Sequence, residues 1–310
     1  MASWLARALA RGFKNDPLIA VVHLRGVIAP PGRGPAGRGR LNADRARPWL
    51  NAAFRLSPAA VALRINSPGG SPAQTELLVA DIRRRAHADR KRQIPIYAFA
   101  EDVAASGGQW LLSGAADAGC SYALPTSIVG SIGVTSPSFG AVVALQKVGL
   151  ERRLYTAGRA KGGLDPFRHV DPAEAGRLEE VLTDLHASFI GAIKASRGPA
   201  LAAAPRPVSE EDLFSGRVWT GRQAAAMGLI DGLGGMREIL SEKFGPATRF
   251  VECGERVGGG GGLFGLFERG GASSTVADAV AGVAAGVPAA VLAALEERAA
   301  YARVGAEWGG

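Results

Sequence analysis

The chain alternates apolar, β-branched runs with stretches whose apolar residues recur at helical spacing, and this order restricts the folds open to it. Runs that favour buried strands lie at 18–28, 59–65, 94–100, 119–123 and 152–156. Stretches that favour helices lie at 42–56, 71–90, 104–112, 139–148 and 172–196. Either Asn42 or Asp44 would cap the first of these helices, and Ser71 the second. The repeated strand–helix order predicts an α/β domain with a largely parallel sheet.

Composition divides the chain into three parts. We expect a basic amphipathic segment at 1–16, a single domain at 17–250, and a Gly-rich linker with a helical tail at 251–310. Within the tail, residues 279–295 form a run of 17 without a charged side chain, and valines recur there at helical spacing. We interpret this run as a helix used in packing or oligomer contact, with a membrane span as the alternative.

Charge and cysteine usage exclude several functional classes. The formal net charge is +8, yet the chain has no zinc finger, aromatic RNA-binding motif or clear helix-turn-helix, so we expect no nucleic acid partner. The two cysteines, Cys120 and Cys253, cannot form a disulfide framework. No Cys/His spacing suggests a zinc site, so we expect neither metal nor cofactor.

The N-terminal segment 1–16 does not read as a secretory signal, because Arg7, Arg11 and Lys14 interrupt its apolar residues. On a helix, its apolar residues lie along one side. The segment is therefore either an interfacial helix on a membrane surface or a helix packed on the domain. We expect a protein of the cytoplasm or of the membrane periphery, without a signal peptide or transmembrane helix.

Two glycine-rich turns fall where predicted strands end, which is where open parallel sheets hold their ligands. The turn at 66–70 reads NSPGG and would expose backbone N–H groups that stabilise developing negative charge. The turn at 104–108 reads AASGG and would present Ser106 as a nucleophile among small neighbours. Each has a structural alternative, a tight turn for the first and a serine helix cap for the second. The second turn lacks the leading glycine of the Gly-x-Ser-x-Gly elbow.

A nucleophilic serine needs a base, and none of the four histidines stands in a convincing partner motif. A lysine can serve where an apolar site disfavours the charged amine. Lys161 lies in the small-residue loop 157–163, directly after the predicted strand 152–156. The alternative is an ordinary solvated lysine.

Taken together, the motifs resemble the signal peptide peptidase A family (SppA/SohB-like). The resemblance spans about residues 17–240, and the order and spacing of the blocks carry it. The blocks are NSPGG at 66–70, AASGG at 104–108, VGSIGV at 129–134, the loop ending at Lys161, and GRVWTGRQA at 216–224 with GLID at 228–231. The resemblance implies a ClpP/crotonase-like fold of repeated ββα units, here with a C-terminal helical extension.

The same resemblance implies the site. Ser106 would be the nucleophile, Lys161 its general base, and Ser131 the residue that orients the lysine amine. The N–H groups of Gly69 and Gly107 would form the oxyanion hole. These roles describe a serine endopeptidase with a Ser-Lys dyad, which needs no metal or cofactor.

The resemblance further implies peptide substrates, namely hydrophobic peptides such as remnant signal peptides or membrane-protein fragments. It implies a homo-oligomeric ring or dome in which the serine and the lysine meet either within one chain or between neighbours. Two other classes stay open: a crotonase-like acyl-CoA enzyme, which would share the oxyanion hole, and a catalytically silent scaffold.

Overall fold

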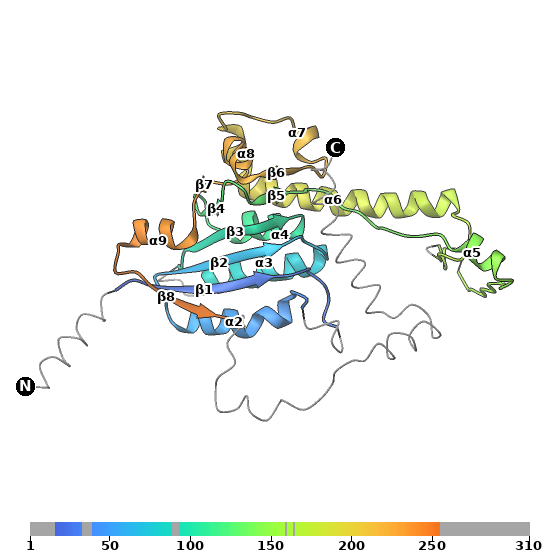
Figure 1. Ribbon diagram of the computed structural model, residues 1–310, viewed down its shortest axis with the longest axis horizontal. Coiled ribbons are helices and arrows are strands. Elements are labelled where there is room, and N and C mark those ends of the chain that lie inside the picture. Colours follow the sequence, from blue (N-terminus) through green and yellow to red (C-terminus); the bar gives the residue numbers. More distant parts are fainter. Residues whose placement is uncertain (1–15, 33–38, 89–92, 159, 164, 255–310) are drawn as a thin grey trace, which may run out of the picture.

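The computed structural model describes residues 16–32, 39–88, 93–158, 160–163 and 165–254, which form one sheet with helices against both faces (Figure 1). The predicted N-terminal segment, apart from its last residue, and the predicted tail from 255 onwards lie outside the described residues. The α/β class predicted from the strand–helix order is confirmed.

A single mixed sheet holds all strands of the described residues. Its order is β6-β5-β3-β2-β1-β8, and β4 pairs with both β3 and β7. Every pairing is parallel except that of β5 with β6, so the predicted parallel character is confirmed. The strands are β1 (Leu18–Arg25), β2 (Ala60–Ser67), β3 (Ile96–Ala105), β4 (Ser121–Ala123), β5 (Ile128–Gly130), β6 (Val218–Thr220), β7 (Gly232–Leu233) and β8 (Arg249–Cys253).

The first five helices of the described residues begin within three residues of their predicted starts, whereas the last three were not predicted. In chain order, the helices are α2 (Ala43–Arg55), α3 (Pro72–Ala86), α4 (Gly107–Ala115), α5 (Val142–Lys147), α6 (Pro172–Ala202), α7 (Glu210–Leu213), α8 (Gly221–Ala226) and α9 (Met236–Phe244). Asn42, rather than Asp44, caps α2, because its Oδ1 accepts the N–H of Arg45 at 2.9 Å. Ser71 caps α3 as predicted.

Two apolar cores lie on opposite faces of the sheet, because strand side chains alternate between the faces. In β1, Ala20, Val22 and Leu24 pack with α2, α3 and α4. The intervening residues Ile19 and Val21 pack with Met236 and Leu240 of α9. All three β1 residues of the first face are fully buried, so the central strands hold the domain together.

Two boundaries differ from the prediction at the end of β3. The predicted strand ended at 100 and the next helix began near 104, but β3 continues to Ala105 and α4 begins at Gly107. The extension is a tertiary effect, since the last residues of β3 pair with β5, a short strand that local periodicity does not reveal.

The predicted strand at 152–156 is wrong. These residues have no strand partner, and Tyr155 is 89% exposed. A strand requires a neighbour for its ladder, and this segment lies where the chain has left the sheet. We call residues 136–171 the arm; Figure 1 shows its helix α5 (green) well beyond the end of the sheet. The helix α5 is shorter than predicted and has no buried residue.

The long helix α6 connects the arm to the body (Figure 1). It ends at Ala202 instead of the predicted 196, and its buried residues, Phe189, Ile193 and Arg197, all lie in its second half. The first half therefore projects with the arm. None of the described helices is both long enough and apolar enough to cross a membrane.

A buried ion pair anchors the second half of α6. Arg197 Nη1 lies 2.8 Å from Asp231 Oδ1, and the Arg197 side chain is only 4% exposed. The guanidinium also donates to the Gly228 carbonyl, while Asp231 accepts from the backbone and the hydroxyl of Ser121. The predicted motif at 228–231 thus ties α6 to the start of β4.

Removing this anchor should destabilise the protein. We expect Arg197→Met to lower the free energy of unfolding by about 3–5 kcal/mol, because Asp231 loses its cation in a largely buried place. Urea unfolding followed by tryptophan fluorescence measures the change. Lys194→Met, one helical turn earlier, breaks the exposed pair with Glu210 and should cost less than about 1 kcal/mol. Equal losses in the two variants would contradict the anchoring role.

Candidate active site

Ser106 occupies the junction between β3 and α4 with a strained backbone. Its φ of 53° and ψ of −120° lie where side-chain-bearing residues are rare, and such strain persists only where the surrounding structure imposes it. The serine makes no side-chain capping bond to α4. The alternative of a plain helix cap therefore lacks the bond that defines it. A sharp strand-to-helix turn is the geometry that presents the nucleophilic serine in α/β-hydrolases.

Ser131 lies beside Ser106 because β3 and β5 are paired. The register places Ala105 opposite Gly130, so the two serines are the next residues on neighbouring parallel strands, whose axes are about 4.8 Å apart. The Ser106 N–H donates to the Gly130 carbonyl at 2.8 Å. Ser131 shares the positive φ of 53°. The carboxyl ends of adjacent strands thus bring two strained serines together, where parallel sheets hold their ligands.

The two predicted oxyanion-hole glycines touch each other and the serine. A Cβ on Gly69 would lie 2.6 Å from Ser106 Cβ and 2.6 Å from the Gly107 nitrogen, so only glycine fits there. As the first residue of α4, Gly107 has an N–H without an acceptor inside the helix. The Gly69 N–H donates to Ser67 Oγ at 3.2 Å, a long bond that an incoming oxyanion would have to replace.

A cavity of about 830 Å³ opens in front of the serines. Ser106 and Ser131 line it together with apolar side chains from several elements. Trp110 of α4 stacks on Phe189 of α6, with ring centroids 5.1 Å apart. The other apolar side chains that line the cavity are Pro68, Pro72, Val134, Leu185 and Val218.

Gln109 is a buried polar residue that the sequence reasoning did not single out. Its Oε1 accepts the Gly130 N–H at 3.1 Å, and its Nε2 donates to Ser113 Oγ at 2.7 Å. The signal was present, since a fully buried amide interrupts the apolar helix α4. Its partner outside α4, Gly130, however, lies in β5, a strand that the sequence analysis did not predict.

No histidine takes the place of the predicted lysine base among the described contacts. The Nε2 of His186 in α6 lies 3.2 Å from the carbonyl oxygen of Ile132, the residue after Ser131, rather than from a serine hydroxyl. The imidazole is thus engaged with backbone next to Ser131.

Lys161 lies apart from the serines in the arm, exposed to solvent. It is not among the residues that line the serine cavity. Its loop contacts the start of α6, where Glu174 crowds Gly163, whereas the serine cavity meets α6 at Leu185. Those two points are about 16 Å apart along the helix. The structure brings Ser106, Ser131, Gly69 and Gly107 together and leaves Lys161 outside.

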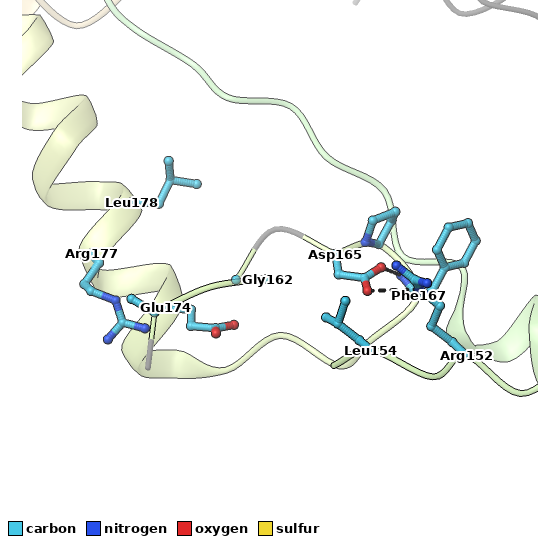
Figure 2. A pocket seen from close by; sticks show the side chains of 11 residues that line it. Arg152, Leu154, Gly162, Asp165, Phe167, Glu174, Arg177 and Leu178 are labelled. Carbon is cyan, nitrogen blue, oxygen red and sulfur yellow. Dashed lines mark hydrogen bonds and ion pairs between the residues drawn. The ribbon is translucent and has the colours of Figure 1, made fainter. Parts of the chain in front are cut away.

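The lysine loop encloses a cavity of its own, of about 710 Å³, against the first turns of α6 (Figure 2). Figure 2 shows Leu154 of the arm across this cavity from Glu174 of the helix, while Asp165 lies beside Arg152. Asp165 closes the loop by accepting from Arg152 Nε at 3.2 Å and from the Phe167 N–H at 3.0 Å. These two bonds tie Asp165 to the described residues on either side of the lysine loop.

Both cysteines of the chain are free thiols. Burial raises the pKa of both the Cys120 and the Cys253 thiols, so both stay protonated near neutral pH. Among the described residues, no three His, Cys, Asp or Glu side chains are grouped to hold a metal ion.

Comparison with known proteins supplies the family. The model of peptidase family S49 matches residues 88–244. A protein of Brucella abortus named Na(+)/H(+) antiporter NhaA is 42% identical over 247 residues, which are 79% of this chain and 32% of that protein. The chloroplastic serine protease SPPA of Arabidopsis thaliana is 30% identical over 59% of this chain and 25% of its own length. Protease 4 of Salmonella typhi is 29% identical over a match that covers 72% of this chain and 34% of that protein.

The chain spans only about a quarter to a third of the length of these three relatives. The antiporter's name thus describes a protein about three times as long as the matched region. The family match covers the serine turn, the block at 129–134 and the lysine loop, and it confirms the resemblance drawn from those motifs. The chain belongs to peptidase family S49.

Proposed function

We propose that the chain is a serine endopeptidase in which Ser106 is the nucleophile. The observation that carries this proposal is the strained Ser106 at the β3–α4 turn, next to Ser131 and to the free N–H of Gly107. An acyl-CoA enzyme would use the same N–H groups but would leave two strained serines without a task. A silent scaffold would leave the serine cavity unexplained as well.

The reaction is acyl transfer. A neutral lysine amine takes the Ser106 proton as the oxygen attacks a peptide carbonyl, and the tetrahedral oxyanion is stabilised by the N–H groups of Gly107 and Gly69. The protonated amine then delivers its proton to the leaving nitrogen. Water, deprotonated by the same amine, hydrolyses the acyl-enzyme. Ser131 lies where its hydroxyl can orient an amine that approaches Ser106.

We assign the base to Lys161 of a second copy of the chain. Within one chain the lysine loop lies at the far end of the arm from the serine cavity. The arm also exposes large apolar side chains that a partner would cover: Phe139, Val143, Val148, Leu150, Tyr155 and Val170. A homo-oligomeric ring or dome would bury this surface and surround the lysine with protein, which favours its neutral form.

The substrate class follows from the lining of the serine cavity. Trp110, Phe189, Leu185 and Val218 offer an apolar surface to side chains near the cleaved bond. We therefore propose hydrophobic peptides in extended conformation, such as remnant signal peptides or membrane-protein fragments.

Within the α/β class, a ClpP/crotonase-like arrangement of ββα units fits the way β3 pairs successively with β4 and β5. Attachment of segment 1–16 to an anionic membrane surface, with a cytoplasmic or peripheral location, rests on the sequence alone.

Ser106→Ala should abolish both peptide turnover and covalent labelling by a fluorophosphonate, because the attacking oxygen is gone. Mass spectrometry of the intact chain measures the labelling. Ser57→Ala is the matched control, since Ser57 also has a positive φ but lies outside the cavity. Equal labelling of Ser106→Ala and wild type would overturn the nucleophile assignment.

Mixing two inactive variants tests where the dyad forms. Ser106→Ala and Lys161→Ala should each be inactive alone. After subunit exchange, an equal mixture should regain activity at about a quarter of the sites, because a head-to-tail contact can pair an intact serine with an intact lysine. Peptide hydrolysis before and after exchange gives the result. A mixture that stays inactive despite proven exchange would instead place both residues in one chain.

Gly69→Ala should remove most activity, because the new methyl group collides with Ser106 Cβ and the Gly107 nitrogen at 2.6 Å each. The control is Gly119→Ala, which imposes the same positive-φ strain where a Cβ meets nothing within 4 Å. The measurement is activity per folded molecule, with the folded fraction taken from circular dichroism. A loss in Gly69→Ala alone is due to the collision at the site, because both variants carry the backbone strain. A similar loss in both variants would contradict the tight contact.

A further inference from the structure

Gln109 is the one side chain of α4 that hydrogen-bonds to the strand preceding Ser131, among the contacts of the described residues. It lies three positions after Ser106, fully buried between Gly108 and Trp110. We infer that Gln109 is a positioning residue that fixes Ser106 and Ser131 relative to each other. This inference rests on the proposed function, since it concerns the efficiency of the same two serines.

The cost of burying an amide indicates that it has a specific task. The neighbours of Gln109 in α4 are apolar, and an apolar side chain in its place would avoid desolvating an amide. Instead, the Gln109 amide is satisfied at both ends, by Ser113 Oγ and by the Gly130 N–H. The second bond reaches out of α4 into β5, so it constrains tertiary structure rather than the helix itself.

Gly130 connects Gln109 to both serines. Its N–H donates to Gln109, its carbonyl accepts the Ser106 N–H, and Ser131 follows it in the chain. A Cβ on Gly130 would lie 2.7 Å from the Trp219 ring, so this peptide is also held from the side of β6. Gln109 therefore acts on the serines only through the Gly130 peptide, and it is not among the residues that line the cavity.

The positive φ values of Ser106 and Ser131 explain why such a bond is needed. Strained backbone relaxes unless its surroundings hold it. Without the Gln109 bond, the N–H of Gly130 loses its acceptor, so the backbone before Ser131 is held less firmly and the Ser131 hydroxyl can shift with respect to Ser106. Small displacements of this kind reduce the rate of the chemical step while leaving substrate binding in the apolar cavity largely unchanged.

The test compares variants of Gln109 in the full-length protein. Gln109→Met keeps the volume but removes the acceptor, and it should lower kcat and the rate of fluorophosphonate labelling by about 100-fold with KM little changed. Ser113→Ala is the matched control, because it removes the partner at the other end of the amide and keeps the bond to Gly130. Its activity per folded molecule should stay close to that of wild type.

Gln109→Glu separates positioning from packing. The substituted carboxylate can still accept from the Gly130 N–H, and the Ser113 hydroxyl can donate to it. If Gln109 positions the serines, kcat per folded molecule should be higher for Gln109→Glu than for Gln109→Met, even where the glutamate variant is less stable. If Gln109 only fills space, Gln109→Met should be the more active, because methionine avoids burying a charge.

Wild-type kcat in Gln109→Met, or a methionine variant more active than the glutamate variant, would overturn the inference. Should Gln109→Met fail to fold, Gln109→Asn replaces it, since the shorter side chain withdraws the oxygen from Gly130 and must again be less active than Gln109→Glu. Ser106→Ala, assayed in parallel, tests the proposed function separately. Full activity in that variant would overturn the peptidase assignment whatever the Gln109 variants show.

Discussion

The parallel pairing of the end of β3 with β5 is the contact on which the candidate site depends. It holds Ala105 against Gly130 and thereby places Ser106 and Ser131 side by side. The pairing also accounts for the strained backbone of both serines, because the backbone must leave the sheet abruptly just after each of the two paired strands ends. Gly130 donates its N–H to Gln109 and accepts the Ser106 N–H at its carbonyl. Helix α4 and the strands β3 and β5 are therefore joined at this residue.

Helix α6 gives the molecule two contrasting halves. Its second half is held by the buried pair of Arg197 and Asp231, and it supplies Phe189 to the wall of the serine cavity. Its first half carries the arm and the lysine loop away from that cavity. Because a helix is rigid over several turns, the anchor at Arg197 also helps to fix where the lysine loop lies relative to the sheet.

The exposed arm and the incomplete site point to the same arrangement. One chain brings Ser106, Ser131, Gly69 and Gly107 together beside an apolar cavity, yet its own Lys161 lies elsewhere. The arm meanwhile leaves Tyr155 and Val170 mostly exposed, and the proposed neighbouring copy would remove this apolar surface from water. Under the proposed function, assembly would then create the active site as well as bury the arm.

The sequence by itself determined the α/β class, the strands β1 to β4, the helices α2 to α6, the caps at Asn42 and Ser71, and the family, because these follow from local periodicity and short motifs. It also singled out Ser106 from its place in a strand-to-helix turn. Only the tertiary structure decided that β3 runs on to Ala105, that 152–156 is not a strand, and that Lys161 lies far from the serines. Strand pairing joins residues distant in sequence, and neither the short strand β5 nor the role of Gln109 has a local pattern that predicts its partner.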